Sequence, residues 1–245
     1  MRIAVLSDFH GNRTALEAVL ADLSNQSPDL VLHAGDIADG GSSPIEVFDR
    51  IRDLGWPGVF GNTDEMLFRP ASLEEFAAQS KAPPALWDAV REIATATRAV
   101  LGEERVAWLR NLPVSLRHPD CVPGLALVHA SPADCWRAPA SDAANADLET
   151  IYSPLGEPIV AYGHTHVPFI RTLSGMPKLV INTGSVGLPY DGDPRASYLL
   201  LDNEQPTIRR VAWDIEQELK LLSACDLPGA AWTAKMLRAS APTLP

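Results

Sequence analysis

The chain has 245 residues and a net charge of −11, with 46% hydrophobic and 21% charged residues. This composition predicts a soluble globular protein of one large domain or two small ones. The acidic balance argues against a long nucleic acid or an anionic membrane as the main partner, because both select stripes of Lys and Arg. The acidic charge does not exclude a phosphorylated small molecule as the substrate, since bound cations reverse the local sign of charge. The sequence has no run of about 18 apolar residues, which predicts no transmembrane helix.

The three cysteines are odd in number and show no CxxC spacing, at Cys121, Cys135 and Cys225. We expect reduced thiols rather than a disulfide framework or a Cys-rich zinc site. The first apolar run, residues 3–6, is too short for a signal peptide. These features predict a cytoplasmic protein.

The first sixty residues alternate between strand and helix patterns. Asn12 is placed to cap the first helix, whose apolar residues recur at helical spacing from Leu16 to Leu23. The expected elements, in order, are a strand at 3–6, a helix from about 12, a strand at 30–32, a helix at 44–54 and a short strand at 59–60. This alternation predicts helices packed on a largely parallel sheet.

Residues 70–113 change character, with Ala, Glu and Arg dominating between Pro70 and Pro113. We predict a helical insertion there, with a further short helix at Trp108 and Leu109. It is too small for a core of its own, so we expect residues 1–245 to form a single domain. Three arginines of the insertion form either a lid over phosphate or a solvated helical face, at Arg91, Arg98 and Arg105.

The rest of the chain returns to strand patterns and ends in two amphipathic helices. The expected strands lie at 125–128, 158–161, 169–172, 179–181 and 197–201, followed by 207–213 as the second arm of a hairpin. The expected helices lie near 214–223 and 227–238. His118 precedes a proline, and we predict that it lies in a surface loop.

Polar residues that can bind metals follow several of the predicted strands. Asp8 and His10 are two residues apart, as are His164 and His166, so in an extended segment each pair points to one side. The remaining donors are Asp36 after Gly35, Asn62 after Gly61, and His129. Strand ends are where open α/β folds place ligands.

Seven oxygen and nitrogen donors are too many for one tetrahedral zinc ion and suit two adjacent ions that share a carboxylate. Mixed His and carboxylate donors without Cys fit Mn, Fe, Zn, Co or Ni. Two such ions about 3.5–4 Å apart clamp a phosphoryl group and lower the pKa of a bridging water. The expected chemistry is phosphoester hydrolysis, with a metal-bridging hydroxide attacking phosphorus.

These blocks occur in the order found in the calcineurin-like metallophosphoesterase superfamily, which the chain resembles. They are Asp8-x-His10, Gly35-Asp36, Gly61-Asn62-x-Asp64, His129 and Gly163-His164-x-His166. The segments 182–187 and 191–198 are similar to the compact bacterial branch. That branch includes YfcE-like phosphodiesterases and proteins labelled diadenosine tetraphosphatase or protein phosphatase.

The resemblance implies an α/β fold, a four-layer αββα sandwich of two mixed β-sheets flanked by helices. It also implies ligand roles: Asp8, His10 and His166 for one metal, Asn62, His129 and His164 for the other, and Asp36 bridging them. Asp36, Asn62 and His129 are the expected catalytic residues.

The chain departs from the family at Thr63, where many members have a histidine thought to protonate the leaving group. A threonine hydroxyl is no acid near neutral pH, so we expect esters with good leaving groups to be favoured, such as aryl or nucleotidyl diesters and anhydrides. We therefore predict a phosphodiesterase or nucleotide-directed enzyme. The alternatives are a phosphomonoesterase or protein phosphatase and, in another class, an interaction scaffold like the retromer subunits of this fold.

Three further residues are candidates for substrate contact. Asn12 either caps its helix or also aims its amide at phosphate, near a helix N-terminus suited to anions. Asp64 either orients a ligand or closes a turn. Trp136 follows His129 in a proline-rich loop and is the best placed of the insertion and loop tryptophans. The sequence leaves the oligomeric state open.

Overall fold

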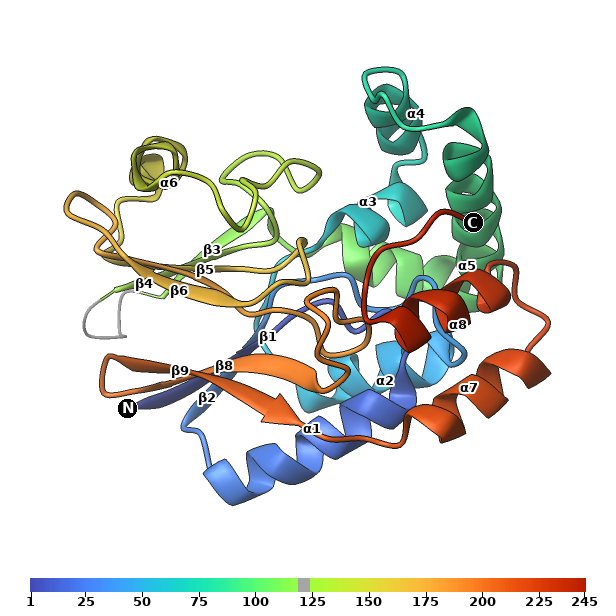
Figure 1. Ribbon diagram of the computed structural model, residues 1–245, viewed down its shortest axis with the longest axis horizontal. Coiled ribbons are helices and arrows are strands. Elements are labelled where there is room, and N and C mark those ends of the chain that lie inside the picture. The colour runs from blue at the N-terminus through green and yellow to red at the C-terminus, as the bar shows by residue number, and fades with distance from the viewer. Residues whose placement is uncertain (119–123) are drawn as a thin grey trace.

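The computed structural model describes residues 1–118 and 124–245; the expectation for Cys121 therefore lies outside the described residues. Two β-sheets lie face to face, and helices cover both outer faces (Figure 1). This is the four-layer αββα sandwich that the sequence predicts. None of the helices in the described part is long and apolar enough to cross a membrane.

The first sheet has the strand order β2-β1-β8-β9. The bounds are β1 Arg2–Leu6, β2 Leu30–His33, β8 Ala196–Asp202 and β9 Gln205–Val211. β1 pairs in parallel with β2 and antiparallel with β8, so the sheet is mixed. β8 and β9 form the expected hairpin, and both residues of its two-residue turn, Asn203 and Glu204, have positive φ angles, as tight hairpins require.

The second sheet has the order β3-β4-β5-β7-β6. The bounds are β3 Ser115–His118, β4 Leu125–Val128, β5 Ile159–Tyr162, β6 Phe169–Thr172 and β7 Leu179–Asn182. β4, β5 and β7 are parallel, and the two edge strands run antiparallel to them. The parallel strands therefore end at one edge, and the loops that follow them meet there.

The inner faces of the two sheets share one apolar layer, because the strands are apolar on both sides. It includes Ile3 and Val5 of the first sheet and Leu127, Ile159 and Ile181 of the second. The outer face of the first sheet packs on α1 (Arg13–Gln26) and α2 (Pro44–Leu54), and that of the second packs on α6 (Asn145–Tyr152), followed by a short 3₁₀ turn (Ser153–Leu155). This double coverage explains why the strands read as continuous apolar runs.

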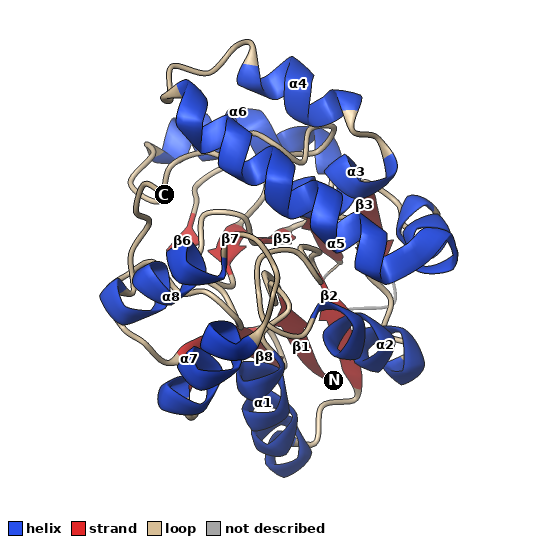
Figure 2. Cartoon of the chain, turned by 90° about the vertical axis from the view of Figure 1, so that its right-hand side faces the viewer, coloured by secondary structure: helices blue, strands red, loops and turns tan. Residues whose placement is uncertain are grey.

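The insertion predicted at 70–113 contains α4 (Ala71–Ala77) and α5 (Pro84–Arg110), and α3 (Asn62–Phe68) directly precedes it. The predicted further short helix at Trp108 and Leu109 is confirmed as the part of α5 after Gly102, where the backbone leaves helical geometry with φ of 74°. Leu101 and Leu109 of α5 pack into the same core as α1 and α2. The chain ends in α7 (Ile215–Ala224) and α8 (Ala230–Ala239), and α7 lies next to α1 in Figure 2.

Two local predictions, for residues 59–60 and for His118, are wrong. The strand expected at 59–60 is only an isolated bridge at Gly58 to His33, because the chain turns at once into α3. His118, expected in a loop, ends strand β3, where its neighbour Arg117 pairs with Ala126. α6 was not expected, because its sequence carries neither a strong apolar stripe nor a side-chain cap.

Candidate metal centre

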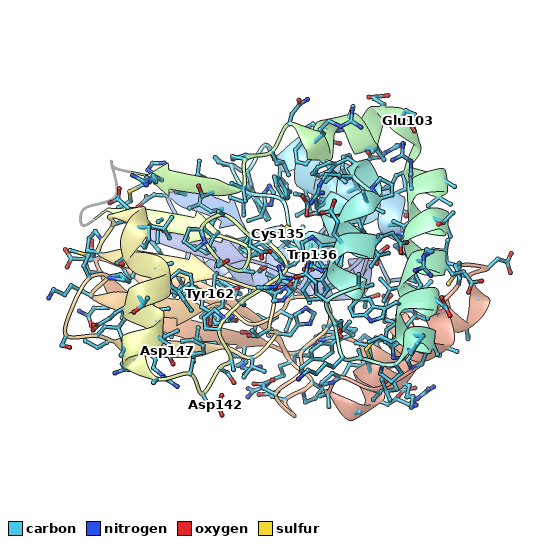
Figure 3. All side chains as sticks on the ribbon, turned by 90° about the horizontal axis from the view of Figure 1, so that it is seen from above. Glu103, Cys135, Trp136, Asp142, Asp147 and Tyr162 are labelled. Atoms are coloured by element: carbon cyan, nitrogen blue, oxygen red, sulfur yellow. The ribbon has the colours of Figure 1, made fainter. Side chains whose placement is uncertain are left out.

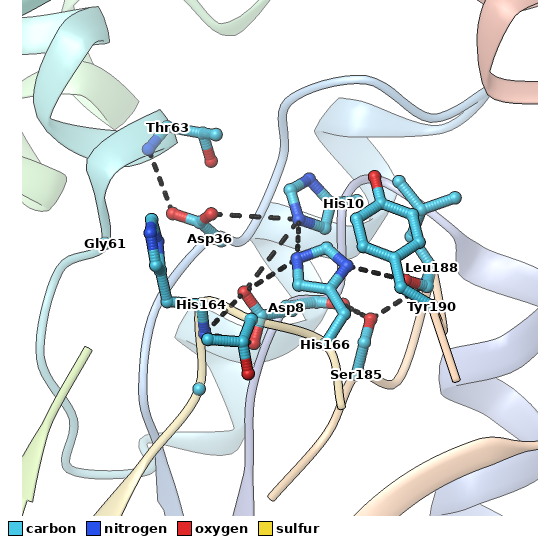
Figure 4. A network of polar contacts seen from close by, with 12 residues as sticks. Asp8, His10, Asp36, Gly61, Thr63, His164, His166, Ser185, Leu188 and Tyr190 are labelled. Atoms are coloured by element: carbon cyan, nitrogen blue, oxygen red, sulfur yellow. Dashed lines mark hydrogen bonds and ion pairs between the residues drawn. The ribbon is translucent and has the colours of Figure 1, made fainter. Parts of the chain in front are cut away.

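The seven predicted donors meet at the edge where the strands of both sheets end. Figure 4 shows five of them, Asp8, His10, Asp36, His164 and His166. Five of the seven have left-handed backbone conformations, with φ between 48° and 64°, namely Asp8, His10, Asp36, His164 and His166. The extended geometry expected for the two i, i+2 pairs is therefore wrong, although the members of each pair do lie close together. Such conformations cost about 1–3 kcal/mol each for residues other than glycine and concentrate at functional sites.

One group of donors comprises Asp8, His10 and His166, whose ligand atoms lie within 4.8 Å of one another. The Nε2 atoms of the two histidines are 3.2 Å apart, and Asp8 Oδ1 is 3.2 Å from His166 Nε2. All three side chains are buried. Burial alone raises the pKa of the Asp8 carboxyl, but the nearby His166 outweighs it and holds that pKa well below its usual range.

A second group is formed by Asn62, His129 and His164. Asn62 Oδ1 lies 2.9 Å from both His129 Nε2 and His164 Nδ1, and these two ring nitrogens are 3.2 Å apart. Burial and the neighbouring His129 lower the pKa of His164 to about 4, which keeps its ring neutral at physiological pH. For His129, burial opposes protonation, but the carboxylates of Asp36 and Asp8 raise its pKa.

Asp36 lies between the two groups. Its Oδ2 is 3.7 Å from His10 Nε2 and 3.5 Å from His129 Nε2, while its Oδ1 accepts a hydrogen bond from Thr63 N at 2.9 Å. Gly61 is required for this approach, because a Cβ there would lie 2.0 Å from Asp36 Oδ1. The carboxylate is therefore placed to be shared by both groups.

The tautomers of three histidines fit a metal site. The Nδ1 atoms of His10, His129 and His166 lie 2.9, 2.6 and 2.5 Å from the backbone carbonyls of Asp39, Ala34 and Leu188. A carbonyl only accepts hydrogen bonds, so each Nδ1 carries a proton, and in the neutral ring each Nε2 is then the atom available to bind a metal. Lone pairs that converge at 3.2 Å repel unless a cation lies between them, and divalent cations supply that charge.

Asp64 supports the centre from behind. Its Oδ2 accepts from Asp36 N at 2.7 Å and Gly61 N at 2.9 Å, and its Oδ1 accepts from Ile37 N at 3.0 Å. Burial and the charge of Asp36 raise the pKa of Asp64 to about 7, and the three N–H donors oppose a further rise. Asp64 is fully buried and does not line the cavity over the centre. These contacts make Asp64 a positioning residue, and its contact with substrate stays a prediction.

The other two substrate candidates differ from each other. Asn12 caps α1 through a bond from Ala15 N at 2.9 Å, and its amide donates to Gly187 O at 2.8 Å. These bonds occupy both ends of a side chain that is 2% exposed, and its contact with substrate also stays a prediction. Trp136 lines the cavity over the centre, together with Thr63.

Two residues beside the centre, Tyr190 and Asp39, were not predicted from the sequence. Tyr190 stacks on His166 with ring centroids 4.3 Å apart and an interplanar angle of 17° (Figure 4). Asp39 is 7% exposed, and its carbonyl holds His10. The position of Asp39, three residues after Asp36, was the available signal. His33, by contrast, is fully buried against Trp108 and is not part of either donor group, so its role is structural.

Two mixed sheets packed face to face, with aspartates and histidines gathered at their strand ends, define the metallophosphoesterase class. The chain belongs to the calcineurin-like phosphoesterase superfamily, whose domain model matches residues 1–205. Members of this superfamily are metal-dependent phosphoesterases, and the clustered donors agree with that chemistry.

The similar proteins cover nearly the whole chain. An uncharacterized protein of Methanocaldococcus jannaschii, MJ0912, is 30% identical over 243 residues, 92% of this chain and 93% of that protein. A metallophosphoesterase of Sphaerobacter thermophilus has 27% identity and a TM-score of 0.77, covering 98% of this chain and 100% of the other. The hypothetical protein PH1004 of Pyrococcus horikoshii OT3 shares the fold, with 21% identity, a TM-score of 0.82 and 99% coverage of each chain.

The compact bacterial branch is also represented among the solved structures. The E. coli phosphoesterase Yfce has 19% identity and a TM-score of 0.51, covering 86% of this chain and 100% of its own. A candidate diadenosine tetraphosphatase has 18% identity and a TM-score of 0.55, covering 87% and 94%. These two matches share the fold of this chain.

Metal binding should stabilise the chain measurably. A cation at 100 times its Kd adds about 2.7 kcal/mol to the free energy of unfolding, which raises Tm by about 5–10 °C for a chain of this size. We expect this shift when manganese is added to EDTA-treated protein, measured by scanning fluorimetry. The His10→Gln/His166→Gln variant is the control and should lose much of it. No shift with manganese, iron, zinc, cobalt or nickel would contradict a metal centre.

Proposed function

We propose that the chain is a dinuclear metal-dependent phosphoesterase that prefers diesters or nucleotide-derived substrates. The observation that carries this proposal is the convergence of histidine ring nitrogens from the two donor groups on either side of the Asp36 carboxylate. Two divalent ions, when bound, neutralise phosphoryl charge and supply a water nucleophile at neutral pH.

The residue roles follow from the two groups. Asp8, His10 and His166 hold one ion, Asn62, His129 and His164 hold the other, and Asp36 is shared. The protein atoms also restrict the ring orientations, because backbone carbonyls hold three of the four imidazoles. This preorganisation lets the substrate phosphoryl group meet fixed charges with little rearrangement.

The preference for diesters rests on Thr63. Its backbone N–H holds Asp36, and its side chain lines the cavity where a leaving group would depart. A threonine hydroxyl does not protonate a leaving group near pH 7. Substrates whose leaving group is stable as an anion, such as aryl or nucleotidyl groups, are therefore favoured over alkyl monoesters.

The direct test compares bis-p-nitrophenyl phosphate with p-nitrophenyl phosphate on metal-stripped protein resupplied with manganese. Faster metal-dependent turnover of the diester supports the proposal. Faster turnover of the monoester would instead favour a phosphomonoesterase or protein phosphatase. Absence of turnover on both, with metal bound, would favour an interaction scaffold.

Thr63→His should change the substrate range. A histidine at the mouth of the cavity adds a general acid, and such groups contribute about 100-fold or more to rate. We expect turnover of alkyl phosphates to rise by about 10-fold or more relative to aryl phosphates, measured as kcat/KM on both series. Thr63→Gln is the matched control, since it has similar length and no acid of suitable pKa. An unchanged ratio of alkyl to aryl kcat/KM in Thr63→His would contradict the proposed role of Thr63.

A further inference from the structure

A cavity of about 280 Å³ opens directly over the candidate metal centre. Its floor includes the donors His10, Asn62 and His164. We call this space the aromatic chamber, because five of its lining residues are aromatic. They are Phe76, Trp87, Trp136, Tyr190 and Trp232.

The aromatic chamber is built by segments outside the two sheets. Phe76 and Trp87 come from α4 and α5, and Trp232 comes from α8. In Figure 3, Trp136 lies between the sheets and the helices of the insertion. The walls of the chamber therefore depend on the insertion and the C-terminal helices, which meet over the strand ends.

Several contacts fix these walls in place. The ring centroids of Phe76 lie 5.6 Å from Trp87 and 5.0 Å from Trp136. The Trp136 indole donates to Glu65 Oε2 at 2.6 Å. α8 is tied to the floor by Thr233, whose hydroxyl donates to Gly40 O at 2.6 Å. The chamber is thus largely pre-formed, as small-molecule sites usually are.

The α5 and α8 sides also meet at close range. Gly229, the residue before α8, has φ of 79°, and a Cβ there would lie 2.3 Å from Ile93 Cδ1 of α5. Ile93 itself lines the chamber. A side chain at position 229 would therefore require the Ile93 side chain, which lines the chamber, to move.

The charge inside the chamber excludes a second phosphate. None of its described lining residues is Lys or Arg, and most of the wall is apolar or aromatic. An anion buried among such side chains, without a cation beside it, is strongly unfavourable. Only the metal centre is suited to a phosphoryl group.

The arginines of α5 do not supply that missing cation. Arg91 donates to Glu74 Oε1 at 2.7 Å, Arg98 to Glu103 Oε1 at 2.7 Å, and Arg105 to Asp49 Oδ2 at 2.7 Å. All three arginines pair with acidic side chains, and none of them lines the chamber. Of the two readings of these arginines, the structure supports a solvated helical face.

We propose that the aromatic chamber binds an uncharged aromatic ring of a substrate with one phosphoryl centre and selects against di- and polyphosphates. This inference rests on the proposed phosphoesterase function and narrows its substrate class. Aromatic rings stack or pack edge-to-face on such walls, and their burial supplies affinity that a methyl ester lacks.

Binding of non-hydrolysable phosphonates to manganese-loaded protein tests this proposal. Phenylphosphonate and methylphosphonate carry the same head group, so their affinities differ only through the ring. We expect phenylphosphonate to bind about 30-fold more tightly, measured by calorimetry. 4-Carboxyphenylphosphonate should bind more weakly than phenylphosphonate, because its added charge enters a chamber that has no Lys or Arg among its described lining residues.

Substitutions in the chamber wall localise the effect. Trp87→Leu and Trp232→Leu should each weaken phenylphosphonate about fivefold or more and leave methylphosphonate unchanged. Trp213→Leu is the matched control, since the Trp213 indole bonds to Pro194 O and lies outside the chamber. We expect that variant to bind both probes like the parent.

The outcomes separate this proposal from the proposed function. Equal affinity for the two phosphonates, or tighter binding of the carboxylated one, overturns the chamber proposal and leaves the phosphoesterase in place. Loss of affinity in Trp213→Leu as large as in Trp87→Leu also overturns it, because the effect is then not local. Failure of both phosphonates to bind the manganese-loaded protein overturns the chamber proposal and the proposed function together.

Discussion

Asp36→Asn is expected to lower metal-dependent turnover of bis-p-nitrophenyl phosphate by about 1,000-fold or more. The Asp36 Oδ2 atom lies within 3.7 Å of ring nitrogens from both histidine groups, at His10 and His129. An amide keeps the shape of the side chain and removes its negative charge, so it bridges two cations poorly. The electrostatic contribution of bound metals is several kcal/mol, and about 4 kcal/mol corresponds to this factor.

Metal content should fall along with activity in that variant. We expect Asp36→Asn to bind fewer ions than the parent when both are loaded with manganese, desalted and measured by mass spectrometry. Asp53→Asn is the control, since Asp53 is exposed near the end of α2 and bonds only to neighbouring Arg52 among the described residues. Full metal content with full turnover in Asp36→Asn would refute the shared carboxylate.

The sequence predicts the donor set because each donor follows a strand pattern that is easy to recognise. Continuous apolar runs stop at Ser7, Val128 and Tyr162, and the polar residues that follow lie at the sheet edge. The strand patterns predict an α/β fold with buried strands, whereas the arrangement in two packed sheets follows from the resemblance to the superfamily. Spacing along the chain suffices where a site is built from strand ends.

The backbone conformation of the donor residues could not be predicted from those spacings. Asp8 and Asp36 have φ angles of 58° and 55°, which non-glycine residues rarely adopt. These angles persist because long-range contacts hold them, such as the bond from Asp8 N to Gly35 O at 3.0 Å. Local propensity predicts extended chain there, and tertiary hydrogen bonds override it.

The aromatic chamber also could not be predicted from the sequence. Trp87 and Trp232 are 145 residues apart, and nothing in their local patterns indicates that α5 and α8 meet. Composition reveals the insertion at 70–113 as helical, but not the face it turns to the centre. Its placement depends on packing of Leu101 and Leu109 into the core shared with α1 and α2.

Stability and metal binding are coupled through Asp64. Asp64→Ala removes the acceptor for three buried N–H groups, those of Asp36, Gly61 and Ile37. Each orphaned donor costs about 1–3 kcal/mol, so we expect the free energy of unfolding to fall by about 3–6 kcal/mol in urea titrations. That is a large share of the stability of a typical domain.

Asp64→Asn separates the charge of this residue from its hydrogen bonds. Its single carbonyl oxygen can replace only part of the acceptor set, so we expect a loss of stability smaller than that of Asp64→Ala. Asp53→Ala, at an exposed site, should change the free energy of unfolding by no more than about 0.5 kcal/mol. Manganese affinity of Asp64→Asn should also fall, by about 10–100-fold, because Asp64 holds the backbone of a ligand. Parent-like stability in Asp64→Ala would mean that water replaces the carboxylate, and the loop carrying Asp36 would then owe its shape to other contacts.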